Sequence, residues 1–106
     1  MEYRRLSEKM SEARRHLMLP HLKGEEQSIA DALIECSAGL RDVTDEELDD
    51  HASACAKTIR AFLDAAAGGY AAKAAGYTPD EKISLGNAVD ELASWATFKF
   101  YEPTSV

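Results

Sequence analysis

Four stretches of the chain repeat apolar side chains every three or four residues, and this spacing constrains the fold more than any other feature. At about 100° per residue, such a repeat forms one apolar stripe along an α-helix. The stripes predict helices over residues 2–18, 25–43, 44–66 and 78–101. The sequence has no convincing run of alternating polar and apolar residues, the pattern of a half-buried strand. It therefore predicts an all-α protein.

Two capping signals predict where helices begin. Thr44 and Thr78 are each followed three residues later by a glutamate. In such a capping box, the hydroxyl and the carboxylate satisfy free backbone N–H groups at a helix start. Pro79 suits the first helical position, where its missing N–H costs nothing. We therefore expect helices to begin at Thr44 and Thr78, with the acidic residues after Thr44 favoured by the helix dipole.

Short connections between the four predicted helices favour a four-helix up-and-down bundle. The alanine-rich segment 70–77 is flanked by glycines and is predicted to be either a short extra helix or a loop. The chain has 106 residues, of which 45% are hydrophobic and 29% charged. This size and composition predict a single helical domain over residues 1–106, with a core that needs neither disulfides nor a structural metal.

The distribution of charge and of apolar residues argues against two classes of partner, nucleic acids and membranes. Residues 1–24 hold six basic and three acidic residues and so carry a net charge of +3. Because the net charge of the whole chain is −7, the other 82 residues carry −10. Such an acidic surface argues against direct binding of nucleic acid over a broad face. The sequence has neither a signal peptide nor an apolar run near the roughly 18 residues that span a bilayer. We therefore expect no membrane partner, a cytoplasmic location and reduced thiols.

His51 and Cys55 are the strongest candidates for metal ligands, because a spacing of four can place two side chains on one ion. Three further residues could complete the set: Cys36, His16 or His21. The helical geometry weighs against this site, since His51 lies about 40° from the stripe that contains Cys55, and Glu47 about 40° further out. We therefore expect no metal and no cofactor, with both cysteines acting as small apolar core residues.

Catalytic chemistry is not expected either. Both cysteines lie in the middle of predicted helices, away from the helix N-termini and cations that activate a thiol. Four carboxylates that could pair across helices fall on predicted solvent faces: Asp31, Glu35, Asp90 and Glu91. No CxxC or HExxH motif is present. The sequence therefore favours a protein that is not an enzyme.

The last predicted helix carries more apolar surface than one bundle core can bury. Ile83 and Phe98 lie away from its core stripe, and Trp95 lies at the edge. Aromatic residues outside a core stripe are typical of protein–protein interfaces, unless the helix phase differs near the ends or segment 70–77 covers them. The predicted interface has six residues: Ile34, Ile83, Trp95, Phe98, Phe100 and Tyr101.

Two functions follow from these observations as expectations. The first is a protein–protein interaction module that forms a homodimer, or docks another protein, through the last helix and the C-terminal aromatic residues. The alternative is an acidic inhibitor that occupies the basic nucleic-acid-binding groove of another protein, because carboxylates can imitate phosphates.

Overall fold

A computed structural model describes residues 3–21, 23–65 and 69–101 of the chain. These residues form helices and no strand, which confirms the predicted all-α class. Segment 70–77 contains a short helix rather than a loop. The elements are α1 (Tyr3–Leu17), α2 (Glu25–Leu40), the 3₁₀ helix η1 (Asp45–Glu47), α3 (Asp50–Ala65), α4 (Tyr70–Ala74) and α5 (Pro79–Tyr101).

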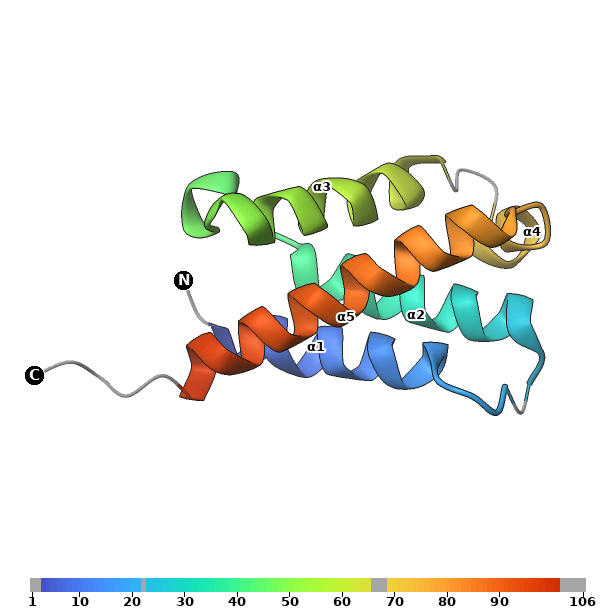
Figure 1. The fold of residues 1–106 in the computed structure, drawn as a ribbon, viewed down its shortest axis with the longest axis horizontal. Coiled ribbons are helices and arrows are strands. Elements are labelled where there is room, and N and C mark those ends of the chain that lie inside the picture. Colours follow the sequence, from blue (N-terminus) through green and yellow to red (C-terminus); the bar gives the residue numbers. More distant parts are fainter. Residues whose placement is uncertain (1–2, 22, 66–68, 102–106) are drawn as a thin grey trace, which may run out of the picture.

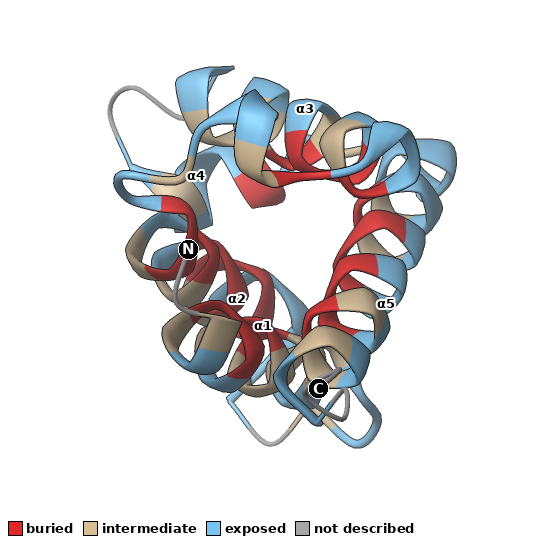
Figure 2. Ribbon diagram, turned by 90° about the vertical axis from the view of Figure 1, so that its left-hand side faces the viewer, coloured by how far each residue is buried: buried red, intermediate tan, exposed pale blue. Residues whose placement is uncertain are grey.

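The four long helices alternate in direction along the chain, as predicted for an up-and-down bundle (Figure 1). Helix α1 packs mainly against α2 and α5, while α3 packs against α5 and α4 covers part of α2. The molecule measures 48 × 26 × 21 Å. Seen along the bundle, the buried faces of the long helices turn towards one shared core (Figure 2).

The largest side chains of the core are ones that the apolar stripes predicted, and alanines outside the stripes fill part of the rest. Each stripe supplies residues that are almost completely shielded from water, so the spacing of three and four identified the inward face of every long helix. The largest of these buried side chains are Leu6, Met10, Leu33, Cys36, Ile59, Leu85, Val89 and Leu92.

The predicted start of α3 is wrong by five residues, because the helix is capped by Asp49 and not by Thr44. The Thr44 backbone N–H and hydroxyl both donate to the Glu47 carboxylate, at 3.0 and 3.1 Å, but this pair closes only the 3₁₀ turn η1. Leu48 is then extended, with φ −115° and ψ 147°, and the α-helix begins at Asp50. The Asp49 carboxylate accepts the Ala52 N–H at 2.8 Å and so caps the first turn of α3.

The capping box at the start of α5 is formed as predicted. The Thr78 N–H donates to Glu81 Oε1 at 2.8 Å, and the Glu81 N–H donates to Thr78 Oγ1 at 3.1 Å. Helix α2 ends at Leu40, three residues earlier than predicted, because Arg41 is extended, with φ −61° and ψ 129°, and Asp42 is left-handed, with φ 66°.

Candidate functional site

The structure separates the predicted interface residues into several places. Ile83 and Phe98 lie near opposite ends of α5, about 22 Å apart along the helix at about 1.5 Å per residue. Ile34 lies on α2, which stands across the bundle from α5 (Figure 2). Their exposed fractions are 51% for Ile34, 60% for Ile83 and 65% for Phe98. These three side chains therefore do not form one continuous surface.

Trp95 makes its contacts within the molecule. Its side chain is half-buried and packs against the core. The indole N–H donates to Asp49 Oδ2 at 2.8 Å, and the ring meets Tyr3 edge-to-face with centroids 5.7 Å apart. The apolar body of the indole covers the end of the bundle while its N–H reaches a carboxylate, as buried tryptophans usually do. Trp95 therefore joins α5 to α1 and to the start of α3.

The last turn of α5 presents three exposed aromatic side chains, Phe98, Phe100 and Tyr101, which we call the aromatic end. Phe100 is 42% exposed and Tyr101 73%, and their rings meet edge-to-face with centroids 4.8 Å apart. The same end of the molecule holds the start of α1 and the start of α3 (Figure 1). The aromatic end is therefore the one place where several of the predicted interface residues lie together.

A second place of interest lies between α3 and α5, where the surface has an open hollow of about 250 Å³. Each helix lines the hollow with four residues at positions i, i+3, i+4 and i+7, a spacing that defines one helix face. The lining residues are His51, Ala54, Cys55 and Thr58 from α3, with Ser84, Asn87, Ala88 and Glu91 from α5.

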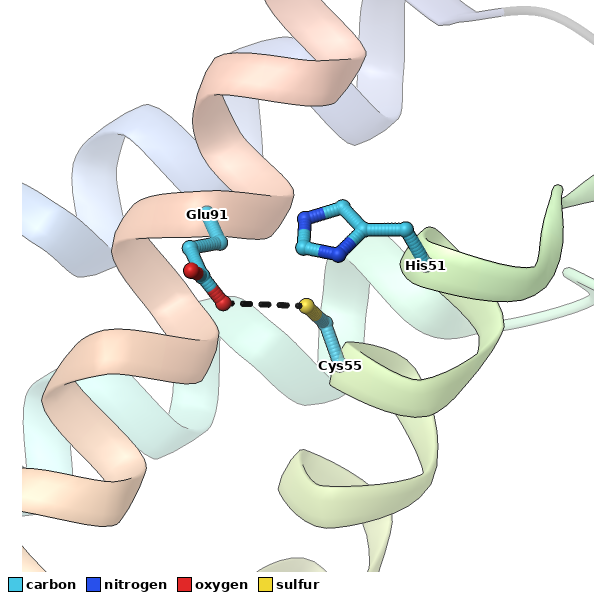
Figure 3. A group of neighbouring side chains, drawn as sticks. All are labelled: His51, Cys55 and Glu91. Atoms are coloured by element: carbon cyan, nitrogen blue, oxygen red, sulfur yellow. Dashed lines mark hydrogen bonds between the residues drawn. The ribbon is translucent and has the colours of Figure 1, made fainter.

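Three of these side chains converge, and we call them the His–Cys–Glu cluster: His51, Cys55 and Glu91 (Figure 3). One ligand-type atom from each lies within 4.8 Å of the other two. The Cys55 thiol donates to Glu91 Oε2 at 3.7 Å. Burial, and then the negative charge of Glu91, raise the pKa of the Cys55 thiol. The thiol is therefore protonated at neutral pH, with the carboxylate as its acceptor.

The sequence paired His51 with Cys55 but missed the third member of the cluster. Glu91 is exposed, as expected, yet its carboxylate reaches the Cys55 thiol. Cys36 lies in the core without exposure to solvent, and burial raises the pKa of its thiol to about 12. The sequence held no signal for Glu91, because every helix has faces with the spacing of residues 84, 87, 88 and 91, and the packing of α5 on α3 decides which face meets His51 and Cys55. Among the described residues, four other candidates stay outside the cluster: Cys36, His16, His21 and Glu47.

Comparison with known protein families, curated proteins and solved structures gives no match. In the described part of the chain, no helix combines the length and hydrophobicity needed to cross a membrane. Function must therefore be inferred from the aromatic end and the His–Cys–Glu cluster themselves.

Proposed function

We propose that the protein is a small interaction module that associates with a second copy of itself through the aromatic end. The observation that carries this proposal is the exposure of neighbouring aromatic side chains at the end of α5, with Phe98 at 65% and Tyr101 at 73%. Aromatic residues combine large apolar area with few rotatable bonds and are enriched in protein interfaces. Burying them against another surface would remove that area from water, at about 25 cal/mol per Å².

The charges around the aromatic end support a second copy as the partner. Lys99, and Arg4 with its neighbour Glu8 at 3.2 Å, supply the positive charge there, while Glu46 in η1 and Asp50 at the start of α3 are exposed. A two-fold axis places the same surface of two copies face to face, so the basic side of one copy can meet the acidic side of the other. Three side chains alone supply less than the roughly 800 Å² per partner of a stable complex, so this charged rim must also be in contact.

A pair of variants on α5 tests the association. Phe98→Glu places a charge in the proposed interface, whereas Ile83→Glu makes the same change at an equally exposed site about 22 Å away. We expect the unmodified protein and Ile83→Glu to dimerise as concentration rises and Phe98→Glu to stay monomeric, as measured by light scattering. Circular dichroism should show all three to be equally helical, because both positions lie outside the core.

Two other results would contradict the proposal. If Phe98→Glu dimerises as well as the unmodified protein, the aromatic end is not the interface. If Ile83→Glu alone becomes monomeric, the copies meet through the other end of α5.

The alternative function, an acidic inhibitor of a nucleic-acid-binding protein, remains a prediction. Part of the negative charge is paired within the chain, since Glu12 lies 2.9 Å from Arg15 and Asp90 lies 3.5 Å from Arg14. Such an inhibitor would act as a monomer, and its affinity for a basic groove would fall steeply with salt. The mass in solution therefore separates the two functions, because association through the aromatic end gives a dimer. The cytoplasmic location stays part of the proposal, supported by two cysteines that are free and buried.

A further inference from the structure

We propose that His51, Cys55 and Glu91 form a binding site for one divalent transition-metal ion of the zinc class. This inference is independent of the proposed association, because none of the three residues belongs to the aromatic end. It also departs from the expectation that the chain binds no metal. The contact that changes this expectation is the one between α3 and α5, which brings Glu91 to the His51–Cys55 pair (Figure 3).

The distances suit a shared ion. Zinc lies about 2.3 Å from a thiolate sulfur and about 2.0 Å from a carboxylate oxygen, so tetrahedral ligation sets these two atoms about 3.5 Å apart. Cys55 Sγ and Glu91 Oε2 are 3.7 Å apart. The three ligand atoms lie within 4.8 Å of one another, so bringing them all to bonding distance of one ion requires movements of about 1 Å. His51 and Glu91 are exposed and are free to rotate that far, whereas Cys55 is fixed in the core.

The chemistry of the three ligands selects the ion. Sulfur and imidazole nitrogen favour borderline and soft ions such as Zn²⁺, while Mg²⁺ and Ca²⁺ prefer oxygen ligands only. On binding, the Cys55 S–H bond breaks, a sulfur–metal bond forms and the proton leaves to the solvent. The thiolate and the Glu91 carboxylate together carry two negative charges, which balance a divalent ion. This balance limits the cost of placing charge at a half-buried site.

Three protein ligands leave one tetrahedral position, which in this site faces the open hollow. Ser84 and Asn87 line the hollow on the same face of α5 as Glu91. We therefore assign water to the fourth position, with these two polar side chains nearby. A bound ion would also link α3 to α5, the same pair of helices that Asp49 and Trp95 join by a hydrogen bond.

Titration of the purified, reduced protein with Co²⁺ tests the site, because a thiolate bound to Co²⁺ gives a charge-transfer band and tetrahedral ligation gives intense visible bands. We expect one Co²⁺ per chain, displaced by one equivalent of Zn²⁺. Cys36→Ala is the matched control, since it removes the other cysteine and leaves the cluster intact. It should retain the complete spectrum.

Three variants should lose the site. Cys55→Ser should abolish the charge-transfer band, and His51→Ala and Glu91→Gln should each weaken binding at least tenfold. His51 and Glu91 are exposed, so these two variants should fold normally and keep the test decisive if Cys55→Ser does not fold. As a second readout, a given concentration of Zn²⁺ should raise the thermal unfolding midpoint of the unmodified protein and of Cys36→Ala more than that of the three ligand variants.

The absence of a thiolate band at saturating Co²⁺ would overturn the proposal. Binding that survives His51→Ala and Glu91→Gln unchanged would overturn it as well, because the ion would then lie elsewhere on the acidic surface.

Discussion

At the scale of single residues, the carboxylate of Asp49 connects two helices. One oxygen accepts the Ala52 N–H at 2.8 Å and caps α3, and the other accepts the Trp95 indole N–H at 2.8 Å from α5. These two hydrogen bonds, the backbone one first, lower the pKa of Asp49. Trp95 in turn packs on Tyr3 of α1, so this one acceptor fixes the geometry at the end of the bundle.

Replacing Asp49 with alanine should lower the unfolding free energy, because a helix cap is lost and the half-buried indole N–H of Trp95 loses its partner. Asp49→Asn should recover part of this loss, since its amide oxygen can still accept. Asp50→Ala, which removes the neighbouring exposed carboxylate, should change the unfolding free energy by no more than about 0.5 kcal/mol. Urea denaturation followed by tryptophan fluorescence measures all three. Equal effects of Asp49→Ala and Asp50→Ala would show that the two contacts contribute little.

The His–Cys–Glu cluster shows what sequence can and cannot predict at this scale. The spacing of His51 and Cys55 fixes them one turn apart on a single helix, so their proximity was predictable. Glu91 comes from another helix, and its reach depends on how closely α3 and α5 approach. Apolar spacing predicts only that Glu91 lies on the solvent-exposed face of its helix. The glutamate side chain is long enough to be exposed and still contact the buried Cys55 thiol.

At the scale of elements, α1 and α2 approach each other closely at Gly39. Gly39 is buried, and a Cβ added there would lie only 2.8 Å from Lys9 Cβ. Lys9 Cβ is attached directly to the backbone of α1 and cannot swing away. The absence of a side chain at Gly39 is therefore what allows the two helices to pack at this distance.

Gly39→Ala should destabilise the bundle by about 1–3 kcal/mol, because α1 and α2 must move apart. Gly86→Ala is the control, since Gly86 lies within α5 and a Cβ there would meet nothing within 4 Å. Alanine at Gly86 should stabilise the protein by about 0.5–1 kcal/mol through its higher helix propensity. Chemical denaturation of the two variants should give shifts of opposite sign. A neutral or stabilising Gly39→Ala would contradict the close approach.

Helix starts were predictable where only one capping signal was available. Thr78 and Glu81 have no competitor nearby, and α5 begins where they predict. At α3, two caps follow one another, one from Thr44 and one from Asp49, and sequence spacing alone does not rank them. The later cap starts the α-helix, while Arg60 donates to the Val43 carbonyl at 2.6 Å and ties the preceding turn to α3.

At the scale of the whole molecule, several carboxylates make the folded state sensitive to acid. The hydrogen bond and charge of Lys82 lower the pKa of Glu25, and a backbone hydrogen bond from Thr44 lowers the pKa of Glu47. The backbone hydrogen bond from Ala52 lowers the pKa of Asp49 in the same way. A group with a lower pKa in the folded state binds fewer protons than in the unfolded state, so its contribution to stability is present only when it is ionised.

We therefore expect the unfolding free energy to be nearly constant from pH 7 to about pH 5 with respect to these groups and to fall as the pH drops from about 5 towards 3. The Glu25→Gln variant should be less sensitive over that interval than the unmodified protein, because one of the three groups no longer titrates. Urea midpoints measured across the pH series test this. An unfolding free energy that rises as the pH falls would contradict the lowered pKa values of these carboxylates.

The overall fold followed from sequence more fully than the interface did. Apolar spacing identifies the inward face of each helix, and alternating direction follows from short connections, so the up-and-down bundle was predictable. The same spacing does not give distances between exposed residues on different helices or at opposite ends of one helix. For that reason Ile34, Ile83 and Phe98 were grouped together, although they lie on separate parts of the surface.

Sedimentation equilibrium of the unmodified protein over a wide concentration range tests the proposed self-association most directly. The chain has a mass of 11.6 kDa, so we predict an apparent mass that rises with concentration towards twice that value. A mass that stays at 11.6 kDa at every concentration would contradict the proposal that two copies meet through the aromatic end.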